Sequence, residues 1–370
     1  MPLDTDFLLQ LFLVLLIAFA ISFASTPLVK AFAEKFGAMD VPKEKRRVHD
    51  HPIPRLGGMA IFFGFILSVI LFADITKQVQ GILIGAVLIV ITGAVDDFVS
   101  LKPGIKFSLQ IIAAVIAVAH GVVVQRLMNP FAAQDSFSLG ILSIPITIIW
   151  IVGVTNSVNL IDGLDGLAVG ISTISSITML IIALLVADGN VALILAALAG
   201  ACIGFIPYNF NPAKIFMGDT GALLLGYVLS TVSIIGLFKF YAVVSFLVPI
   251  LALALPISDT IFAFTRRILK GQNPMKADRG HFHHRLIDLG FNQKQAVAIL
   301  YFISAILGLT AVVLTTSGPL KALILFAAFL IALTICRHAV HTKYHEISAR
   351  SNNKQKSDHP DEKESSDENN

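Results

Sequence analysis

Aspartates stand among apolar residues and glycines in three segments of this 370-residue chain, where carboxylates are rare. Asp96 and Asp97 are adjacent in GAVDDFVSLKPGIK, Asp162 and Asp165 are close together in NSVNLIDGLDG, and Asp219 lies in NPAKIFMGDTGALLLG. Clustered carboxylates without cysteine suit a hard cation, and Mg²⁺ prefers oxygen ligands completed by waters or substrate phosphates. These acids therefore indicate a carboxylate–metal site.

Basic side chains accompany the acids. Lys106 follows the adjacent aspartates, and KADRGHFHHRL contains Arg279 with His281, His283 and His284. Cationic groups suit anionic phosphates, and phosphoryl transfer needs charge neutralisation and in-line positioning with little covalent participation by the protein. No GxxxxGK[ST] motif occurs, which excludes a Walker-type nucleotide site. The HFHH spacing could belong to a zinc site, but the sequence has neither an HExxH motif nor a cysteine pair beside it.

The composition places these residues in a membrane protein. Hydrophobic residues make up 56% of the chain and charged residues 14%, whereas soluble domains are about 45–50% apolar and about 25% charged. A bilayer span needs about 20 mostly apolar residues, and continuous apolar runs favour helices. We therefore predict an all-α, polytopic fold with about eleven transmembrane helices, the ninth of which Pro249 and Pro256 could kink. The runs are 7–26, 57–73, 81–97, 105–124, 141–159, 166–187, 190–207, 219–236, 241–264, 295–316 and 319–337.

The distribution of Lys and Arg predicts the orientation. Most of these residues in short loops fall on one side of the predicted spans, and the other side has Lys77, Arg126, Lys239 and Lys321. The positive-inside rule makes the basic side cytoplasmic, so we expect the N-terminus outside and the C-terminus inside. Residues 1–345 then form one transmembrane domain. The polar residues 346–370 cannot bury enough surface to fold alone, and we expect a disordered cytoplasmic tail.

On this topology the acid and histidine clusters all fall on the cytoplasmic face. Each cluster also has a structural interpretation: the adjacent aspartates could end a helix, Asp165 or Asp219 could cap a helix N-terminus, and the histidines could belong to a basic membrane-surface loop. Acids near the membrane are costly and are functional by default. Four polar clusters on one face favour a functional site over four unrelated structural features.

Five motifs in order resemble those of the polyprenyl-phosphate N-acetylhexosamine-1-phosphate transferase superfamily, which also contains the phospho-MurNAc-pentapeptide transferase. They are PRLGG at 54–58, DDFVSLKPGIKF, NSVNLIDGLDGL, NPAKIFMGDTGALLLG and GHFHHRL, and the resemblance runs from about residue 40 to 300. Membership implies a multi-pass enzyme of the cell membrane with a cytoplasmic active site. It implies transfer of a sugar-1-phosphate from a UDP-sugar to undecaprenyl phosphate, release of UMP, and Mg²⁺ as cofactor, with Mn²⁺ as a substitute.

Two segments resemble the branch that uses UDP-GlcNAc, the enzymes of teichoic acid and O-antigen initiation. HPIPRLGG at 51–58 is similar to the segment before the second span in that branch, whereas the pentapeptide branch tends to carry a PTMGG-like segment. The HFHH pattern likewise differs from the three consecutive histidines of the pentapeptide branch. UDP-GlcNAc is thus the expected donor, with another UDP-HexNAc or UDP-MurNAc-pentapeptide as the alternative. The resemblance implies no nucleic-acid partner, and homodimers are common in the superfamily.

The resemblance also assigns roles to the acids. Asp219 matches the principal Mg²⁺ ligand. Asp96 and Asp97 match paired acids near the prenyl phosphate, one of which deprotonates it or assists metal placement, so Asp97 is a second candidate ligand. Asp162 and Asp165 match acids that organise the nucleotide and the metal. We therefore expect these four acids, beside Asp219, to take part in catalysis.

Other residues match substrate-binding positions. Lys106 matches a basic residue that holds phosphate, and the segment from Arg279 to His284 matches the loop that grips the donor diphosphate. The remaining candidates are amides within or near the motifs. The expected substrate-binding residues are Lys106, Asn156, Asn159, Asn209, Arg279, His281, His283 and His284.

Mechanism and protein class leave alternatives open. Transfer could proceed by direct attack of the prenyl phosphate oxygen or through an aspartyl-phosphate. We favour direct attack, because prenyl phosphate is already an oxyanion nucleophile. A transporter or lipid carrier is the main alternative from another class. Transporters usually place charges near the midplane in related halves, whereas these acids lie at predicted helix ends and the sequence shows no internal repeat.

Overall fold

The structure is a computed structural model that describes residues 4–41, 52–128, 136–186, 188–236, 244–269, 271, 281–317, 320–321, 323–327 and 330. The chain divides into two units, Met1–Pro319 and Leu320–Asn370. The elements and the site below belong to the first unit. The eleventh expected helix, at 319–337, falls largely outside the described residues, and the expected tail at 346–370 falls outside them entirely.

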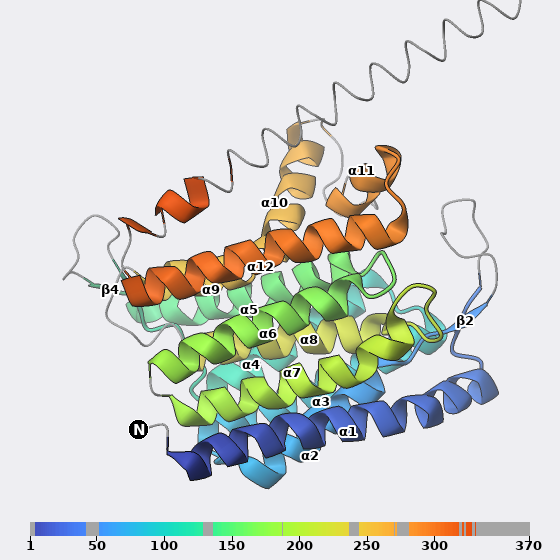
Figure 1. Cartoon of the computed structure of the whole chain (residues 1–370), viewed down its shortest axis with the longest axis horizontal. Coiled ribbons are helices and arrows are strands. Elements are labelled where there is room, and N and C mark those ends of the chain that lie inside the picture. Colours follow the sequence, from blue (N-terminus) through green and yellow to red (C-terminus); the bar gives the residue numbers. More distant parts are fainter. Residues whose placement is uncertain are drawn as a thin grey trace, which may run out of the picture. The chain divides into compact units, whose positions relative to one another are not determined.

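Helices dominate the first unit, with two short pairs of strands between them (Figure 1). The described helices are α1 (Thr5–Phe36), α2 (Gly58–Phe72), α3 (Lys77–Val99), α4 (Pro103–Ala119), α5 (Ser143–Ile161), α6 (Leu167–Leu185), α7 (Gly189–Asn209), α8 (Gly218–Gly236), α9 (Val244–Ala252), α10 (Ala254–Leu269), α11 (Phe282–Asp288) and α12 (Gln293–Ser317). The described strands are β1 (Met39–Asp40), β2 (Ile53–Pro54), β3 (Arg126–Met128) and β4 (Ser136–Ser138).

The predicted polytopic helical fold is confirmed. The first eight expected runs correspond to α1 through α8, and the tenth corresponds to α12. Seven of the described helices are long and apolar enough to cross a membrane, namely α1, α3, α5, α6, α7, α8 and α12. Helices α2 and α4 are also apolar but shorter, at 15 and 17 residues. The protein is therefore a multi-pass membrane protein.

The ninth expected helix is broken, as its prolines suggested. Helix α9 ends at Ala252 and α10 begins at Ala254. Pro256 has no N–H to donate to the carbonyl of Ala252, four residues earlier, and the Ser175 hydroxyl of α6 donates to that carbonyl at 2.7 Å. A freed carbonyl at membrane depth needs such a partner. After the break, α10 turns away from the direction of α9 (Figure 1).

Helix α8 is the centre of the bundle. Every residue in it except Asp219 is buried, and it contacts α2, α3, α5, α6 and α7. Two glycines let neighbouring helices approach its first turn. A Cβ atom added to Gly58 of α2 would lie 2.0 Å from the backbone nitrogen of Gly221, and one added to Gly93 of α3 would lie 2.5 Å from the Cα of Thr220. This close packing sets the position of the start of α8.

The segment after β2 is tied to the segment before α8. Strands β1 and β2 form an antiparallel pair, and the chain then runs beside residues 216–217. Phe216 N donates to Pro54 O at 2.8 Å, and Gly57 N donates to Phe216 O at 2.9 Å. The PRLGG motif is therefore held directly against the FMGDTG motif, although the two lie far apart in the sequence. The other strands, β3 and β4, pair antiparallel with each other.

Candidate active site

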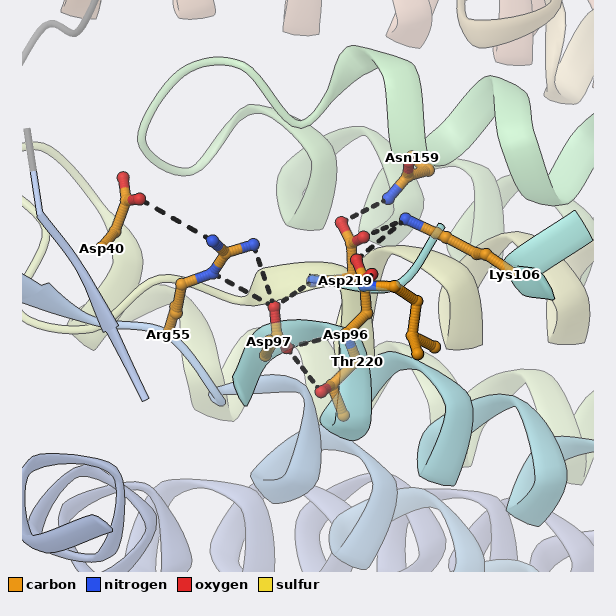
Figure 2. Close-up of polar contacts among 9 residues, drawn as sticks. Asp40, Arg55, Asp96, Asp97, Lys106, Asn159, Asp219 and Thr220 are labelled. Carbon is orange, nitrogen blue, oxygen red and sulfur yellow. Dashed lines mark hydrogen bonds and ion pairs between the residues drawn. The ribbon is translucent and has the colours of Figure 1, made fainter. Parts of the chain in front are cut away.

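Asp219 lies in the first turn of α8 and is the one residue of this helix that is not buried. The N-terminus of a helix favours negative charge, because its first backbone N–H groups have no partner inside the helix. Asn159, near the end of α5, donates from its amide to Asp219 Oδ1 at 2.9 Å. Lys106 of α4 contacts Asp219 Oδ2 through its ammonium group (Figure 2). Three helices therefore converge on this carboxylate.

Lys106 also reaches Asp96, so one ammonium group joins two carboxylates. Its Nζ lies 3.3 Å from Asp96 Oδ2, while Asp96 Oδ1 accepts from Leu101 N at 2.6 Å. The side chains of Lys106, Asp96 and Asp219 are 17%, 12% and 20% exposed. These three charged groups are therefore close together and accessible to a ligand.

Asp97 points away from Asp96, because consecutive helical residues are about 100° apart around the axis. Its carboxylate is fully buried and accepts from Asp219 N at 3.0 Å, from Thr220 N at 3.1 Å and from the Thr220 hydroxyl at 2.6 Å. It also pairs with Arg55 at 3.2 Å. Asp97 therefore caps the start of α8 from a neighbouring helix (Figure 2).

Arg55 braces this cap. Its Nε donates to Asp97 Oδ1 at 3.2 Å, and its Nη2 forms an ion pair with the same oxygen at 3.2 Å. Its Nη1 lies 3.8 Å from a carboxylate oxygen of Asp40 in β1. Its backbone forms a bridge with Phe216, just before α8. In the sequence, PRLGG is one of the five motifs of the resemblance and part of the segment that indicates the branch. In the structure, its arginine supports the residues around Asp219.

A cavity of about 320 Å³ lies beside Asp219. Its wall comes from the loop between α5 and α6, from the start of α8 and from residues near β1 and β2. Asp40, Arg55 and Gln293 line this cavity, although they were not expected site residues. The expected residues that line it are Asn159, Asp162, Asp165, Asn209, Asp219 and His284.

Asp162 directly follows α5 and contributes to the cavity wall. Burial raises the pKa of its carboxyl to about 8, and the negative charges of Asp219 and Asp97 add to this effect. The smaller contribution from the neighbouring charges reflects repulsion between carboxylates that lie close together. A cation would relieve that repulsion.

Asp165 does not cap α6, so that structural alternative is wrong. The N-cap position is Gly166, whose φ of 77° is in the left-handed region that glycine adopts readily. Asp165 Oδ2 instead accepts from the Asn211 amide at 2.9 Å and from Ala213 N at 3.0 Å. It thereby holds the loop that leads from α7 to Asp219.

The loop at 162–166 is fastened by two further helices. Asn209, at the end of α7, accepts from Gly166 N at 3.1 Å, and Tyr301 of α12 donates to Gly166 O at 2.5 Å. Asn156 has a different place: its amide donates to Gln110 Oε1 of α4 at 2.5 Å, and it does not line the cavity. Asn209 thus supports the cavity wall, while Asn156 joins two helices.

The three histidines differ in their surroundings. His281 and His283 are 5% and 2% exposed, and a Cβ atom added to Gly163 would lie 2.3 Å from His283 Nε2. Burial lowers the pKa of His283 to about 3, with a contribution from His284. Of the three, His284 lines the cavity. Arg279 lies outside the described residues.

Asp259 of α10 was not among the expected site residues. It accepts from Phe282 N at 2.8 Å, and its other oxygen lies 2.7 Å from His281 Nδ1. It is a lone acid inside the ninth apolar run, so the cost of an acid in such a run could have identified it. Asn211 and Gln293, which bond each other at 2.7 Å, carry no comparable signal, because amides are ordinary in loops and at helix starts.

The donors around Asp219 suit Mg²⁺. Within the part of the chain that the structure describes, no group of three or more His, Cys, Asp or Glu could hold a metal. Mg²⁺ does not need such a group, because it is usually held through one or two carboxylates, with waters and substrate phosphates as further ligands. Asp219 and Asp96 offer that number of carboxylates, and they already share one cationic group.

Comparisons with known proteins agree with these motifs. The family model described as glycosyl transferase family 4 matches residues 79–237, which include all the acids of the first three clusters. The chain is 41% identical over 311 residues to the probable undecaprenyl-phosphate N-acetylglucosaminyl 1-phosphate transferase of Bacillus subtilis (strain 168), with 82% of this chain and 86% of the relative covered.

Two further relatives have related names. The decaprenyl-phosphate N-acetylglucosaminephosphotransferase of Mycolicibacterium smegmatis is 35% identical over 321 residues, which cover 79% of each chain. The undecaprenyl-phosphate alpha-N-acetylglucosaminyl 1-phosphate transferase of Thermotoga maritima is 31% identical over 265 residues, which cover 71% of this chain and 78% of the relative. The chain therefore belongs to the polyprenyl-phosphate N-acetylhexosamine-1-phosphate transferase superfamily, in its undecaprenyl-phosphate N-acetylglucosaminyl 1-phosphate transferase branch.

Proposed function

We propose that this protein transfers GlcNAc-1-phosphate from UDP-GlcNAc to undecaprenyl phosphate, giving undecaprenyl-pyrophosphoryl-GlcNAc and UMP. The observation that carries the proposal is the cluster of Asp96, Lys106 and Asp219, the last of which lines a cavity at the end of a membrane-spanning bundle. Such a place can bring a soluble nucleotide sugar and a membrane lipid to the same charged groups. The names of the relatives support a prenyl phosphate acceptor and N-acetylglucosamine as the sugar.

We infer that Mg²⁺, or Mn²⁺ in its place, is the cofactor. Asp219 would hold the ion with Asp96 as a second carboxylate, and the bound ion would neutralise charge on the substrate phosphates. Asp97 was expected as a ligand, but its oxygens accept three hydrogen bonds from the start of α8 and pair with Arg55. We therefore assign Asp97 to holding Asp219 in place.

Other residues of the site would bind and orient the two substrates. Lys106 is placed to hold the acceptor phosphate, Asn159 orients Asp219, and His284 faces the donor from the cavity wall. In direct attack, an oxygen of the acceptor phosphate forms a bond to the phosphorus that carries the sugar. The bond from that phosphorus to the UMP oxygen breaks, and UMP leaves with the electron pair. The attacking oxygen is already an anion, so no proton has to be removed first.

We also infer that the site faces the cytoplasm at the cell membrane. The segments around the cavity are basic, with Arg55, Lys102, Lys106 and Lys214 near the acids in sequence. The positive-inside rule makes such an end cytoplasmic. A cytoplasmic site would receive a nucleotide sugar from solution on the same side.

Release of UMP tests the proposed reaction. Purified protein in detergent with UDP-GlcNAc and Mg²⁺ should release UMP when undecaprenyl phosphate is present and should release none without it. Competition among UDP-HexNAc sugars and UDP-MurNAc-pentapeptide should show preference for UDP-GlcNAc. Preference for another donor would assign the chain a sibling reaction, and the absence of UMP with every donor would favour the transporter alternative.

Direct attack predicts that no sugar phosphate becomes bonded to the protein. Incubation with UDP-GlcNAc and Mg²⁺, without the lipid acceptor, should leave the mass of the intact protein unchanged. Mass spectrometry of the intact protein measures this, with the unincubated protein as the control. A phosphosugar adduct on Asp96 or Asp97 would contradict the one-step mechanism and support the aspartyl-phosphate route.

A further inference from the structure

We propose that Asp259 is a positioning residue that holds the histidine segment 281–284 against the cavity, and that it acts through His281. The inference rests on the proposed function, in which His284 faces the donor. The residues concerned come from three places: Asp259 from α10, the histidines from the start of α11, and the cavity wall from the loop between α5 and α6. The contacts between them form a continuous path.

The first step in the path is the pair of contacts that Asp259 makes. Its Oδ2 lies 2.7 Å from His281 Nδ1, and its Oδ1 accepts from Phe282 N at 2.8 Å. The side chains of Asp259 and His281 are 3% and 6% exposed. A buried carboxylate needs such partners, because an unpaired charge is costly away from water. Asp259 therefore joins α10 to the first backbone N–H of α11 and to the ring beside it.

The second step is the tautomer of the His281 ring. An ionised carboxylate only accepts hydrogen bonds, so His281 Nδ1 carries the hydrogen that it shares with Asp259. The hydrogen bond at one ring nitrogen sets the state of the other nitrogen. Asp259 thus holds His281 in one tautomer and one ring orientation.

The third step leads from His281 to the cavity. The rings of His281 and His283 are within 9° of parallel, with centroids 5.8 Å apart, and His283 lies against Gly163, the neighbour of Asp162. The low pKa of His283 keeps its ring neutral at neutral pH, which suits a packing role. The ring centroids of His283 and His284 are 4.3 Å apart, and His284 lines the cavity.

The path begins in α10, the helix that follows the break. Helix α10 is separated from α9 by this break, and it contacts the histidine segment directly. The ring of Phe262 packs against that of Phe282, with centroids 5.9 Å apart, and Asp259 contacts His281 and Phe282. Of these contacts, Asp259 supplies the charged one. Loss of its charge would therefore disturb His284 and the loop at 162–166 together.

Asp259→Asn tests this role, because asparagine keeps an oxygen for Phe282 N but presents an amide N–H to His281. His281 must then accept at Nδ1 and carry its proton on Nε2. We expect the KM for UDP-GlcNAc to rise about tenfold, because the changed tautomer of His281 would disturb the position of His284, with the KM for undecaprenyl phosphate unchanged. Asp288→Asn changes an exposed aspartate of α11 in the same way, and it should leave both constants unchanged.

Nitrogen NMR of the protein labelled with ¹⁵N-histidine gives a readout that does not depend on turnover. In the wild type, His281 should carry a proton on Nδ1. In Asp259→Asn the proton should be on Nε2. The signals of His281 are identified by their absence from the spectrum of His281→Asn. A wild-type His281 ring without a proton on Nδ1, or kinetics of Asp259→Asn equal to those of Asp288→Asn, would overturn the proposal. If Asp259→Asn does not fold, the wild-type spectrum still decides.

His284→Gln separates this inference from the proposed function. It should raise the KM for UDP-GlcNAc while leaving the His281 signals unchanged. An unchanged donor KM in His284→Gln would show that the histidine segment does not contact the donor, which counts against the proposed role of His284. The NMR result would still establish or reject the link from Asp259 to His281.

Discussion

Asp96 and Asp97 are neighbours in the sequence, but helix α3 directs their side chains to different partners. Asp96 pairs with Lys106, while Asp97 receives hydrogen bonds from the first turn of α8. The acidic types and their motif could be predicted from the sequence. The different roles of the two acids could not be predicted, because they depend on whether each side chain contacts α4 or α8.

Asp97→Asn should lower stability, whereas Asp96→Asn should chiefly lower turnover. Asparagine at 97 turns one accepting oxygen into a donor facing Thr220 or Arg55, and unsatisfied buried groups cost about 1–3 kcal/mol. Asparagine at 96 keeps an acceptor for Leu101 and loses only the charge beside a partly exposed lysine. Thermal unfolding and UMP release measure the two effects. Equal losses of melting temperature would contradict the assignment of Asp97 as the cap of α8.

Asp219→Ala should reduce turnover on the order of 100-fold or more, the scale seen when one group that stabilises developing charge is removed. Helix α8 should stay formed, because Asp97 caps it without the Asp219 side chain. UMP release across a range of Mg²⁺ concentrations measures the loss. Asp74→Ala is a matched control, since the hydrogen bonds of Asp74 with Asn190 use its backbone. Near-normal turnover of Asp219→Ala would show that the metal assignment is wrong.

At the scale of the elements, the apolar runs predicted the long helices because the membrane leaves the backbone few other choices. Pro249 and Pro256 suggested a kink in the run 241–264, but the sequence does not show which of them lies at the break or which group satisfies the carbonyl of Ala252. That group is Ser175 of α6, and a serine inside an apolar run does not reveal its partner. The backbone hydrogen bonds between PRLGG and residues 216–217 could not be predicted either, because they join segments that are far apart in the sequence.

Ser175→Ala should destabilise the protein by about 0.6 kcal/mol and by at most about 1.7 kcal/mol, the mean and the maximum measured for hydrogen bonds between membrane helices. The carbonyl of Ala252 would lose its donor, and Pro256 cannot replace it. Ser176→Ala is the control, because the Ser176 hydroxyl donates to Ser172 O within its own helix. Thermal unfolding in detergent compares the two variants. A loss of stability in Ser176→Ala as large as in Ser175→Ala would contradict the role given to Ser175.

At the scale of the whole molecule, the site is assembled from segments spread over most of the sequence. The five motifs supplied nearly all of its charged groups, and the order of helices placed their ends together. Sequence patterns could not separate His284, which lines the cavity, from His283, which packs behind it, or from Asn156, which joins two helices. That distinction depends on side-chain direction in the folded bundle, as does the place of Asp259.

The most direct test of the account is the identity of the lipid product. Wild-type protein incubated with UDP-GlcNAc, undecaprenyl phosphate and Mg²⁺ should yield undecaprenyl-pyrophosphoryl-GlcNAc, identified by mass spectrometry of the extracted lipid, in equal amount to the UMP released. Asp219→Ala should yield little of either. Consumption of UDP-GlcNAc with the lipid unmodified, or an undiminished yield from Asp219→Ala, would contradict the assignment of this site as a GlcNAc-1-phosphate transferase.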